Sequence, residues 1–281
     1  MLQRTIALLA ALLMLSCAAL AEGGLGAVAD ESQMTEHVDV VDPSWTPVTA
    51  DMLNDGVYSV QVDSSSSMFA ILGCDLTVAD GAFSATLHMK SNAYMYLFPG
   101  TPEDAAAADP ADLILVELTP EGGFDFTFPI EAMDAGVECA AFSARKQLWY
   151  PRTLVFRSDS LPMEAWKAEN LVTVETLGLA DGTYSVDVAL EGKGKTTLET
   201  PATLTVTDGA AMADIVFSTK KIDYVIVDGE KYLPTNTEGN AAFTVPVALF
   251  DNKIAITVDS TAIKPATEVS YSMTFDSASI R

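Results

Sequence analysis

Basic residues are scarce in this sequence of 281 residues. It contains 15 lysines and arginines against 39 aspartates and glutamates, which gives a formal net charge of −24. A protein that grips nucleic acid or an anionic membrane surface needs clustered Lys and Arg, because it must neutralise a polyanion. The charge balance therefore argues against both classes of partner.

Histidine and catalytic motifs are also lacking. His37 and His88 are the only histidines, which leaves little room for a multi-histidine metal centre. No G-x-S-x-G, H-E-x-x-H or Walker pattern occurs, and no EF-hand loop organises the abundant carboxylates. We therefore expect no catalytic residues, no metal site and no enzymatic activity. A titratable pair buried in a cleft would reopen the possibility of an enzyme.

The first 21 residues have the pattern of a targeting segment. Residues 1–4 are short and positive, residues 5–15 are apolar, and residues 19–21 read Ala-Leu-Ala. The apolar stretch is too short for a bilayer span of about 20 residues, so a signal peptide ending at residue 21 is predicted. The alternative is a bacterial lipobox with lipid attached to Cys17. Both alternatives export the protein to an extracellular or cell-surface location.

The rest of the chain has no run approaching 18 apolar residues, so no transmembrane segment is expected. Residues 22–51 are rich in Gly, Asp and Glu without hydrophobic periodicity, which predicts a flexible acidic tether. Hydrophobic residues make up 49% of the chain, enough for genuine cores. The length suits two domains.

The remaining sequence repeats itself. Four segments occur twice in the same order, namely residues 55–62 and 181–188, 75–81 and 203–209, 126–130 and 243–247, and 154–158 and 273–277. Such self-similarity indicates repeated structural units. It predicts two homologous domains in tandem, residues 52–161 and 178–281, joined by a linker at residues 162–177.

Each repeated segment has the pattern of a β-strand. Apolar and polar residues alternate, as in residues 56–62, so one face packs on a core and the other meets water. Asp-Gly pairs at 80–81 and 208–209 predict hairpin turns, because glycine tolerates the positive φ of a type I′ turn. Short strands with frequent turns predict an all-β protein of two tandem antiparallel immunoglobulin-like β-sandwich domains. A short helix is expected within residues 101–113, where a Thr precedes acidic residues and an Ala run.

Two cysteines, Cys74 and Cys139, lie beyond the targeting segment. Thiols in an oxidising compartment usually pair, so we expect a disulfide that closes a loop of about 65 residues within the first domain. Two free buried thiols, or a metal or redox role, are the alternatives.

One segment departs from the acidic trend. Residues 142–152 combine three cations with three aromatic side chains: Phe142, Arg145, Lys146, Trp149, Tyr150 and Arg152. A guanidinium pairs with a carboxylate and an aromatic ring stacks on a planar group, so this segment suits a planar or anionic small ligand. The alternative is an ordinary loop whose cations neutralise nearby acids and whose Trp belongs to the core.

The order of these motifs resembles that of NEAT domains, which are immunoglobulin-like haem-binding modules of Gram-positive cell surfaces. The resemblance lies in D-G-x-Y-x-V at 55–60, the Ser-rich stretch with Met at 64–69, L-T-V-x-D-G at 76–81, and the final strand at 268–276. It implies a β-sandwich that binds haem through a Y-x-x-x-Y motif, in which the first Tyr ligates iron and the second supports it. These two positions fall on Leu148 and Arg152 in the first repeat and on Thr267 and Tyr271 in the second, so the motif is incomplete in both.

The sequence thus predicts an exported, non-catalytic surface protein that binds a small ligand, the candidate cofactors being haem or another iron-linked group. The expected ligand-binding residues are Ser67, Met68, Phe69, Arg145, Lys146, Trp149, Tyr150, Arg152 and Tyr271. The alternative is a structural or adhesive module that presents a surface to protein or glycan. A filled, flat surface between Met68 and Trp149 would favour that alternative.

Overall fold

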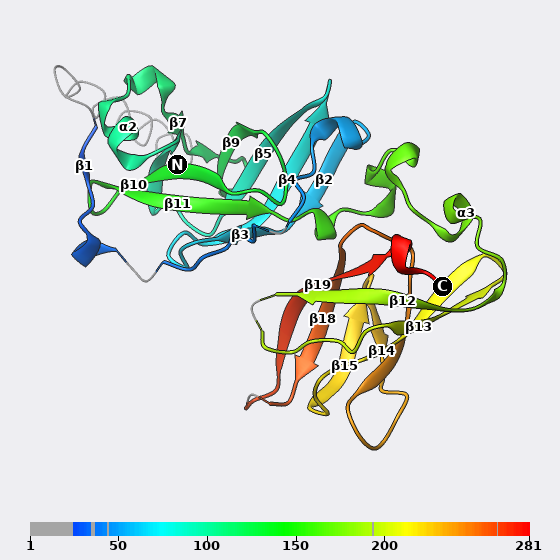
Figure 1. Ribbon diagram of the computed structural model, residues 1–281. Coiled ribbons are helices and arrows are strands. Elements are labelled where there is room, and N and C mark those ends of the chain that lie inside the picture. Colours follow the sequence, from blue (N-terminus) through cyan, green and yellow to red (C-terminus); the bar gives the residue numbers. More distant parts are fainter. Residues whose placement is uncertain (1–24, 35–36, 44, 193, 263) are drawn as a thin grey trace. The chain divides into compact units, whose positions relative to one another are not determined.

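The computed structural model of the chain describes residues 25–34, 37–43, 45–192, 194–262 and 264–281. They are nearly all β (Figure 1). The chain divides into two compact units, the first ending at Arg157 and the second beginning at Ser158. The predicted signal peptide and Cys17 lie outside the described residues.

Helices are few and short. In the described residues the α-helices are α2 (Pro102–Ala107) and α3 (Val174–Leu177). Helix α2 falls where a helix was expected, because the Thr101 hydroxyl accepts a hydrogen bond from the Asp104 amide (3.1 Å) and caps its first turn. Single 3-10 turns occur at Glu31–Gln33, Ala50–Met52, Pro110–Asp112, Ser158–Ser160, Met163–Ala165, Ala168–Asn170 and Ser277–Ser279. None of the described helices is long and apolar enough to cross a membrane.

The first unit contains two sheets. One has the order β2 (Gly56–Val60), β4 (Ile71–Ala79), β5 (Ala82–Met89), β9 (Phe124–Ile130), β8 (Glu117–Leu118). The other has the order β1 (Ala27–Val28), β11 (Leu148–Phe156), β10 (Val137–Ser143), β6 (Tyr94–Pro99), β7 (Ile114–Leu115), with β3 (Val62–Ser64) also paired to β11. The rings of Phe128 on β9 and Phe156 on β11 meet edge to face, with centroids 6.3 Å apart. The two sheets therefore pack against each other through their apolar faces.

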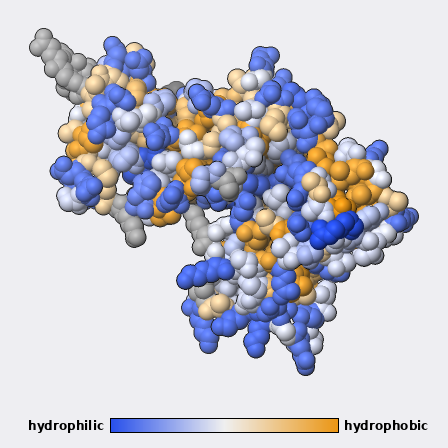
Figure 2. Space-filling view, viewed as in Figure 1, coloured by the Kyte–Doolittle hydropathy of each residue, from blue (hydrophilic) through white to orange (hydrophobic). Residues whose placement is uncertain are grey.

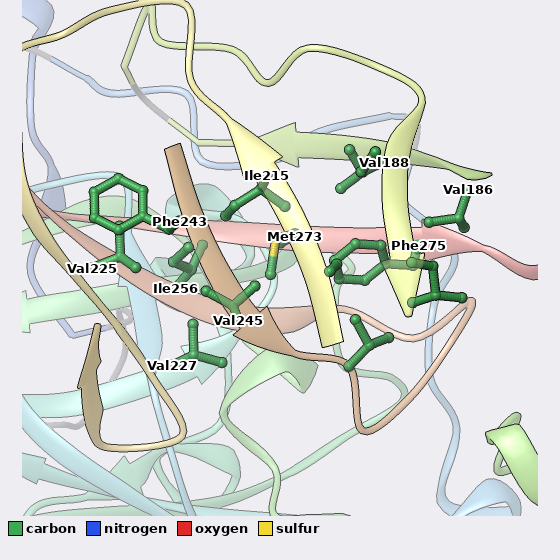
Figure 3. Close-up of a cluster of buried hydrophobic side chains, with 14 of the residues drawn as sticks. Val186, Val188, Ile215, Val225, Val227, Phe243, Val245, Ile256, Met273 and Phe275 are labelled. Carbon is green, nitrogen blue, oxygen red and sulfur yellow. The ribbon is translucent and has the colours of Figure 1, made fainter. Parts of the chain in front are cut away.

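The second unit is built on one eight-stranded sheet. Its order is β16 (Glu230–Tyr232), β15 (Ile222–Val227), β18 (Ile254–Ser260), β19 (Thr267–Asp276), β12 (Gly182–Glu191), β13 (Ala202–Thr207), β14 (Ala210–Val216), β17 (Ala242–Pro246). The first half of β12 pairs with β13 and its second half with β19. Buried side chains from strands on both sides of β12, including Ile215, Val225, Phe243 and Phe275, gather in one core (Figure 3).

The two units share one pattern of strand pairing. Phe156 of β11 pairs with Val62 of β3, and Phe275 of β19 pairs with Val188 of β12. These are the residues that the sequence repeat places in equivalent positions. The all-β prediction is confirmed, and the repeat extends to strand register. The immunoglobulin-like assignment of both units stays a prediction.

The predicted Asp-Gly turns are present in both units. Asp80 and Gly81 have φ of 52° and 74°, and Asp208 and Gly209 have φ of 51° and 77°. Positive φ at both central residues is what a type I′ hairpin requires. The turns join β4 to β5 and β13 to β14.

The segment predicted as a flexible tether is packed on the first unit in its described part. Strand β1 pairs in parallel with Leu148 and Trp149 of β11, and Val48 forms a bridge with Met133. Ala29 and Val40 are buried as well. The prediction of a tether over residues 22–51 is therefore corrected for the described residues. The segment packs through isolated apolar residues and through a strand of only two residues. Contacts of this kind produce no hydrophobic periodicity in the sequence, so the sequence did not indicate them.

Candidate functional site

Residues 65–70 form the link between β3 and β4, here called the lip. Its start is fixed to β11, because the Ser65 amide donates to the Thr153 carbonyl and the Thr153 amide donates to the Ser65 hydroxyl, both at 2.9 Å. The Phe69 amide then donates to the Ser66 carbonyl at 3.1 Å, which turns the chain back. The Met68 side chain is 61% exposed, whereas Phe69 is 1% exposed. The lip thus places one apolar side chain outside and one inside, next to residue 152.

Strand β11 sends alternate side chains to opposite faces of its sheet. Tyr150, Arg152 and Phe156 share one face, and Phe156 shows that this face is turned toward the other sheet of the unit. Trp149 is on the opposite face, where it packs with Ala105 of helix α2 and with Phe142. Trp149 and Tyr150, which are consecutive on β11, therefore lie on opposite faces of the sheet and have different neighbours.

Arg152 is enclosed by three aromatic rings. Its Cζ lies 5.3 Å from the ring centroid of Tyr150, 5.5 Å from that of Tyr94 and 6.0 Å from that of Phe69. Phe69 and Tyr94 also meet edge to face at 5.1 Å. We call these four residues the aromatic cage. All four side chains are buried, and Arg152 is only 7% exposed.

The charge of Arg152 has no carboxylate partner among the described residues. Its Nη1 donates to the Pro151 carbonyl at 2.6 Å and its Nη2 donates to the Tyr94 hydroxyl at 2.8 Å. Its Nε is buried and finds no acceptor in the part of the chain that the structure describes. Cys139, which pairs with Arg152 across β10 and β11, is a neutral thiol because burial raises its pKa to about 12. A buried unpaired cation is costly, and the faces of aromatic rings offset only part of that cost.

The structure brings together some of the predicted ligand-binding residues. Phe69, Tyr150 and Arg152 meet in the aromatic cage, and Ser67 and Met68 are exposed on the lip beside it. Arg145 and Lys146 lie instead in the exposed turn between β10 and β11, away from the cage. The cationic segment of the sequence is therefore split between a buried site and an exposed turn.

Trp149 does not belong to this site, and that prediction is corrected. Its indole Nε1 donates to the Leu25 carbonyl, and its ring lies 5.1 Å from that of Phe142. It is fully buried on the outer face of the sheet, under the N-terminal segment and helix α2. The physical reason is strand parity, since Trp149 and Tyr150 are consecutive and must point to opposite faces.

Tyr271 is the counterpart of Arg152 in the second unit and belongs to that unit's core. Its ring packs against the backbone of Gly192 and Gly194, where a Cβ would overlap the ring. Thr267, at the first motif position, is exposed. Tyr271 therefore has a separate environment from the cage residues of the first unit.

Tyr94 belongs to the cage, although it is not among the ligand-binding residues predicted from the sequence. It begins strand β6 and reaches Arg152 although β10 lies between β6 and β11. A tyrosine at a buried strand position needs a partner for its hydroxyl, which is the one indication the sequence offered. The identity of that partner depends on strand order.

The predicted disulfide is absent. Cys74 and Cys139 are both free and buried, and they belong to different sheets, on β4 and β10. The structure therefore shows the alternative of two free, buried thiols. Burial raises the pKa of Cys74 to about 12, as it does for Cys139.

His88 joins three strands on the exposed face of the five-stranded sheet. Its Nδ1 lies 3.0 Å from Oδ1 of Asp125 on β9, and its Nε2 lies 3.3 Å from Oδ2 of Asp75 on β4. The hydrogen bond to Asp125 is the main cause that raises the pKa of His88. Across the described ranges, no group of three or more His, Cys, Asp or Glu side chains is placed to hold a metal ion.

Comparisons with known proteins return matches among solved structures alone. No protein-family model matches the chain, and no curated protein matches it. Matching solved structures include a point mutant of IsdX2-NEAT5 in complex with haem, which is 16% identical. That match covers 35% of this chain and 97% of the NEAT chain, with a TM-score of 0.30. The chain is therefore similar to a NEAT domain over about a third of its length, at a level that assigns neither ligand nor residue roles.

Proposed function

We propose that the protein is an exported, non-catalytic surface protein whose first unit binds a planar anionic ligand, with haem as the leading candidate. The observation that supports this is the aromatic cage. Its rings suit stacking on a planar molecule, and its guanidinium suits a carboxylate. Both chemistries occur at one place in the unit, beside an exposed apolar residue of the lip.

The cage contains the types of side chain that bind haem in proteins, namely a cation for a propionate and phenol oxygens for the iron. Arg152 would pair with a propionate, and the phenol oxygens of Tyr94 and Tyr150 are the candidate iron ligands. Leu148, at the family's iron-ligating position, has no donor atom, so we assign that role to Tyr150, which shares its face of β11. Haem, when bound, would supply an iron centre with phenolate ligation.

The cage is closed in this structure. Phe69 is buried against Tyr94 and beside the Arg152 guanidinium. A ligand would therefore take the place of the Phe69 ring, and the lip would have to move outward. Backbone hydrogen bonds at Ser65 hold the start of the lip on β11, so the movement would fall on Met68 and Phe69.

Titration of the purified chain with haemin tests the proposal. We expect a saturable Soret band, and we expect Tyr150→Phe to weaken or shift it because the phenol oxygen is removed. Tyr224→Phe is the matched control, since Tyr224 is a partly exposed tyrosine of the second unit that bonds Glu268. Tyr271→Phe separates binding in the second unit from binding in the first. Absence of a Soret change in the unmodified protein would rule out haem.

A structural or adhesive role is the second candidate. It is favoured by the closed cage together with exposed apolar side chains on the first unit, Met68 at 61% and Leu72 at 71%. On the face drawn in Figure 2, hydrophobic residues lie among hydrophilic ones. Binding of the chain to immobilised glycans and extracellular proteins would test this role. Loss of binding in Met68→Ser and Leu72→Ser, with no haemin binding, would favour it over the first candidate.

Export is tested by expression in a secreting bacterial host. We expect a mature protein that begins at residue 22, identified by its intact mass. Lipid attachment would instead give a protein that begins at Cys17 and becomes unanchored in Cys17→Ser. A product that keeps residues 1–21 in the cytoplasm would contradict both alternatives.

A further inference from the structure

We infer that Arg152 is a carboxylate receptor, so that the ligand of the aromatic cage is an aromatic or planar carboxylate. The inference rests on the proposed function only in placing a ligand at the cage. It names the chemical class that the cage selects, whether or not the ligand contains iron.

The hydrogen-bond donors of Arg152 are incompletely used. A guanidinium carries five N–H donors and no acceptor, and the acceptors of this one are the Pro151 carbonyl and the Tyr94 hydroxyl. Among the residues described, Nε has none. Nε and Nη2 lie on the same edge of the guanidinium, which is the edge that a carboxylate occupies with two parallel hydrogen bonds. The Tyr94 hydroxyl accepts from Nη2, so its own proton is available to an anion at that edge.

Among the described residues, the groups that the structure places beside Arg152 are phenols, a thiol and a phenyl ring. They are the Tyr94 phenol on β6, the Cys139 thiol on β10, the Tyr150 phenol on β11 and the Phe69 ring of the lip. The chain holds 39 acidic residues, yet none of the described ones forms an ion pair with Arg152. An anion from outside the chain would supply the missing charge.

Arg157 shows the contrast within the same unit. It follows β11 and also lies over an aromatic ring, 5.0 Å from the centroid of Trp45. Its Nη1, however, bonds Oδ2 of Asp63 at 2.9 Å. Arg157 is thus a neutralised structural cation, whereas Arg152 is stabilised by rings and neutral acceptors. This difference makes Arg157 the internal control for any test of Arg152.

The three aromatic rings stabilise the Arg152 guanidinium in the absence of a ligand. Their electron-rich faces stabilise a guanidinium, though less well than a carboxylate does. A ligand with a ring and a carboxylate would replace the Phe69 contact with its own ring and place its carboxylate at Nε. A neutral aromatic ligand would gain only the first of these interactions, and a small aliphatic carboxylate only the second.

The experiment uses the mature chain labelled with ¹⁵N and follows the arginine Nε–Hε signals by NMR. The probe is sodium benzoate, and benzamide is the neutral probe of the same shape. Arg152→Lys assigns the Arg152 signal, and Arg157→Lys assigns that of the control. We expect benzoate to shift the Arg152 signal to saturation, benzamide to leave it in place, and the Arg157 signal to stay fixed. No shift with benzoate, or an equal shift with benzamide, would overturn the inference.

Haemin and its dimethyl ester separate this inference from the proposed function. If both hold, the unmodified chain binds haemin at least about tenfold more tightly than the ester, the effect of one charge-assisted interaction, and Arg152→Gln removes the difference. Haemin binding without any preference over the ester overturns the carboxylate inference and leaves haem binding intact. A benzoate response without haemin binding would support the carboxylate inference and rule out haem as the ligand.

Discussion

Arg152 donates a hydrogen bond of 2.8 Å to the hydroxyl of Tyr94, a residue 58 positions earlier in the chain, and both side chains are buried. Their strands are not neighbours, because β10 runs between β6 and β11. On β10 the residues that share this face are small, Cys139 opposite Arg152 and Ala141 opposite Tyr150. Small side chains on the middle strand let the guanidinium reach across it to the Tyr94 hydroxyl.

Replacement of Arg152 by methionine tests whether Arg152 stabilises the fold or is present for ligand binding. Methionine has a similar length and no charge, and exchanging buried ionic groups for apolar ones is often neutral or stabilising. For Arg152→Met we expect a free energy of unfolding that is unchanged or raised by about 1 kcal/mol, measured by urea denaturation. Arg157→Met, which removes the ion pair with Asp63, should destabilise. A loss above about 2 kcal/mol in Arg152→Met would mark Arg152 as structural.

The His88 cluster should make stability depend on pH. The hydrogen bond to Asp125, with a smaller contribution from Asp75, raises the pKa of folded His88 above its ordinary value of 6.5. Stabilisation by the protonated ring is therefore complete below about pH 6 and is lost as pH rises through the folded pKa. The effect should be at most about 1 kcal/mol because the groups are partly exposed.

The measurement is the free energy of unfolding between about pH 5 and pH 9, which brackets the ordinary pKa of histidine, for the unmodified chain and for Asp125→Asn. The variant should lose most of the pH dependence in this window, since it removes the charged acceptor of the Nδ1 contact. An identical slope in both proteins would show that the cluster does not contribute. His88→Gln serves as the control without a titrating ring.

The two thiols of the first unit should be free and unreactive. Burial raises the pKa of Cys74 and Cys139 to about 12, so little thiolate is present near pH 8. We expect both thiols to react with Ellman's reagent at once in guanidinium chloride and slowly in the folded protein. An intact mass two hydrogens lower, with no reaction after denaturation, would restore the disulfide predicted from the sequence.

The hairpin turns should respond alike in the two units. Gly81 and Gly209 have positive φ, and a Cβ at either position would meet nothing within 4 Å. Gly81→Ala and Gly209→Ala should therefore each cost about 1 kcal/mol through backbone strain alone, measured by chemical denaturation. Unequal losses that differ by more than this amount would contradict the equivalence of the two turns.

Much of the fold could be predicted from the sequence because its indications are local. Alternation located the strands, and the Asp-Gly pairs located two turns whose positive φ is confirmed. The site was predicted less well. The composition predicts residues 142–152 as one cluster, although strand parity places Trp149 and Tyr150 on opposite faces of β11.

The all-β class, the repeated order of strands and the turn positions could be predicted from the sequence, since each follows from residues near one another in the chain. The contact of Tyr94 with Arg152, the placement of Cys74 and Cys139 on different sheets, and the pairing of residues 27–28 with β11 arise from the folded arrangement. These contacts depend on which strands are neighbours and which faces are covered. A pattern of alternation shows which side chains share a face of one strand, but packing between distant segments determines what that face contacts.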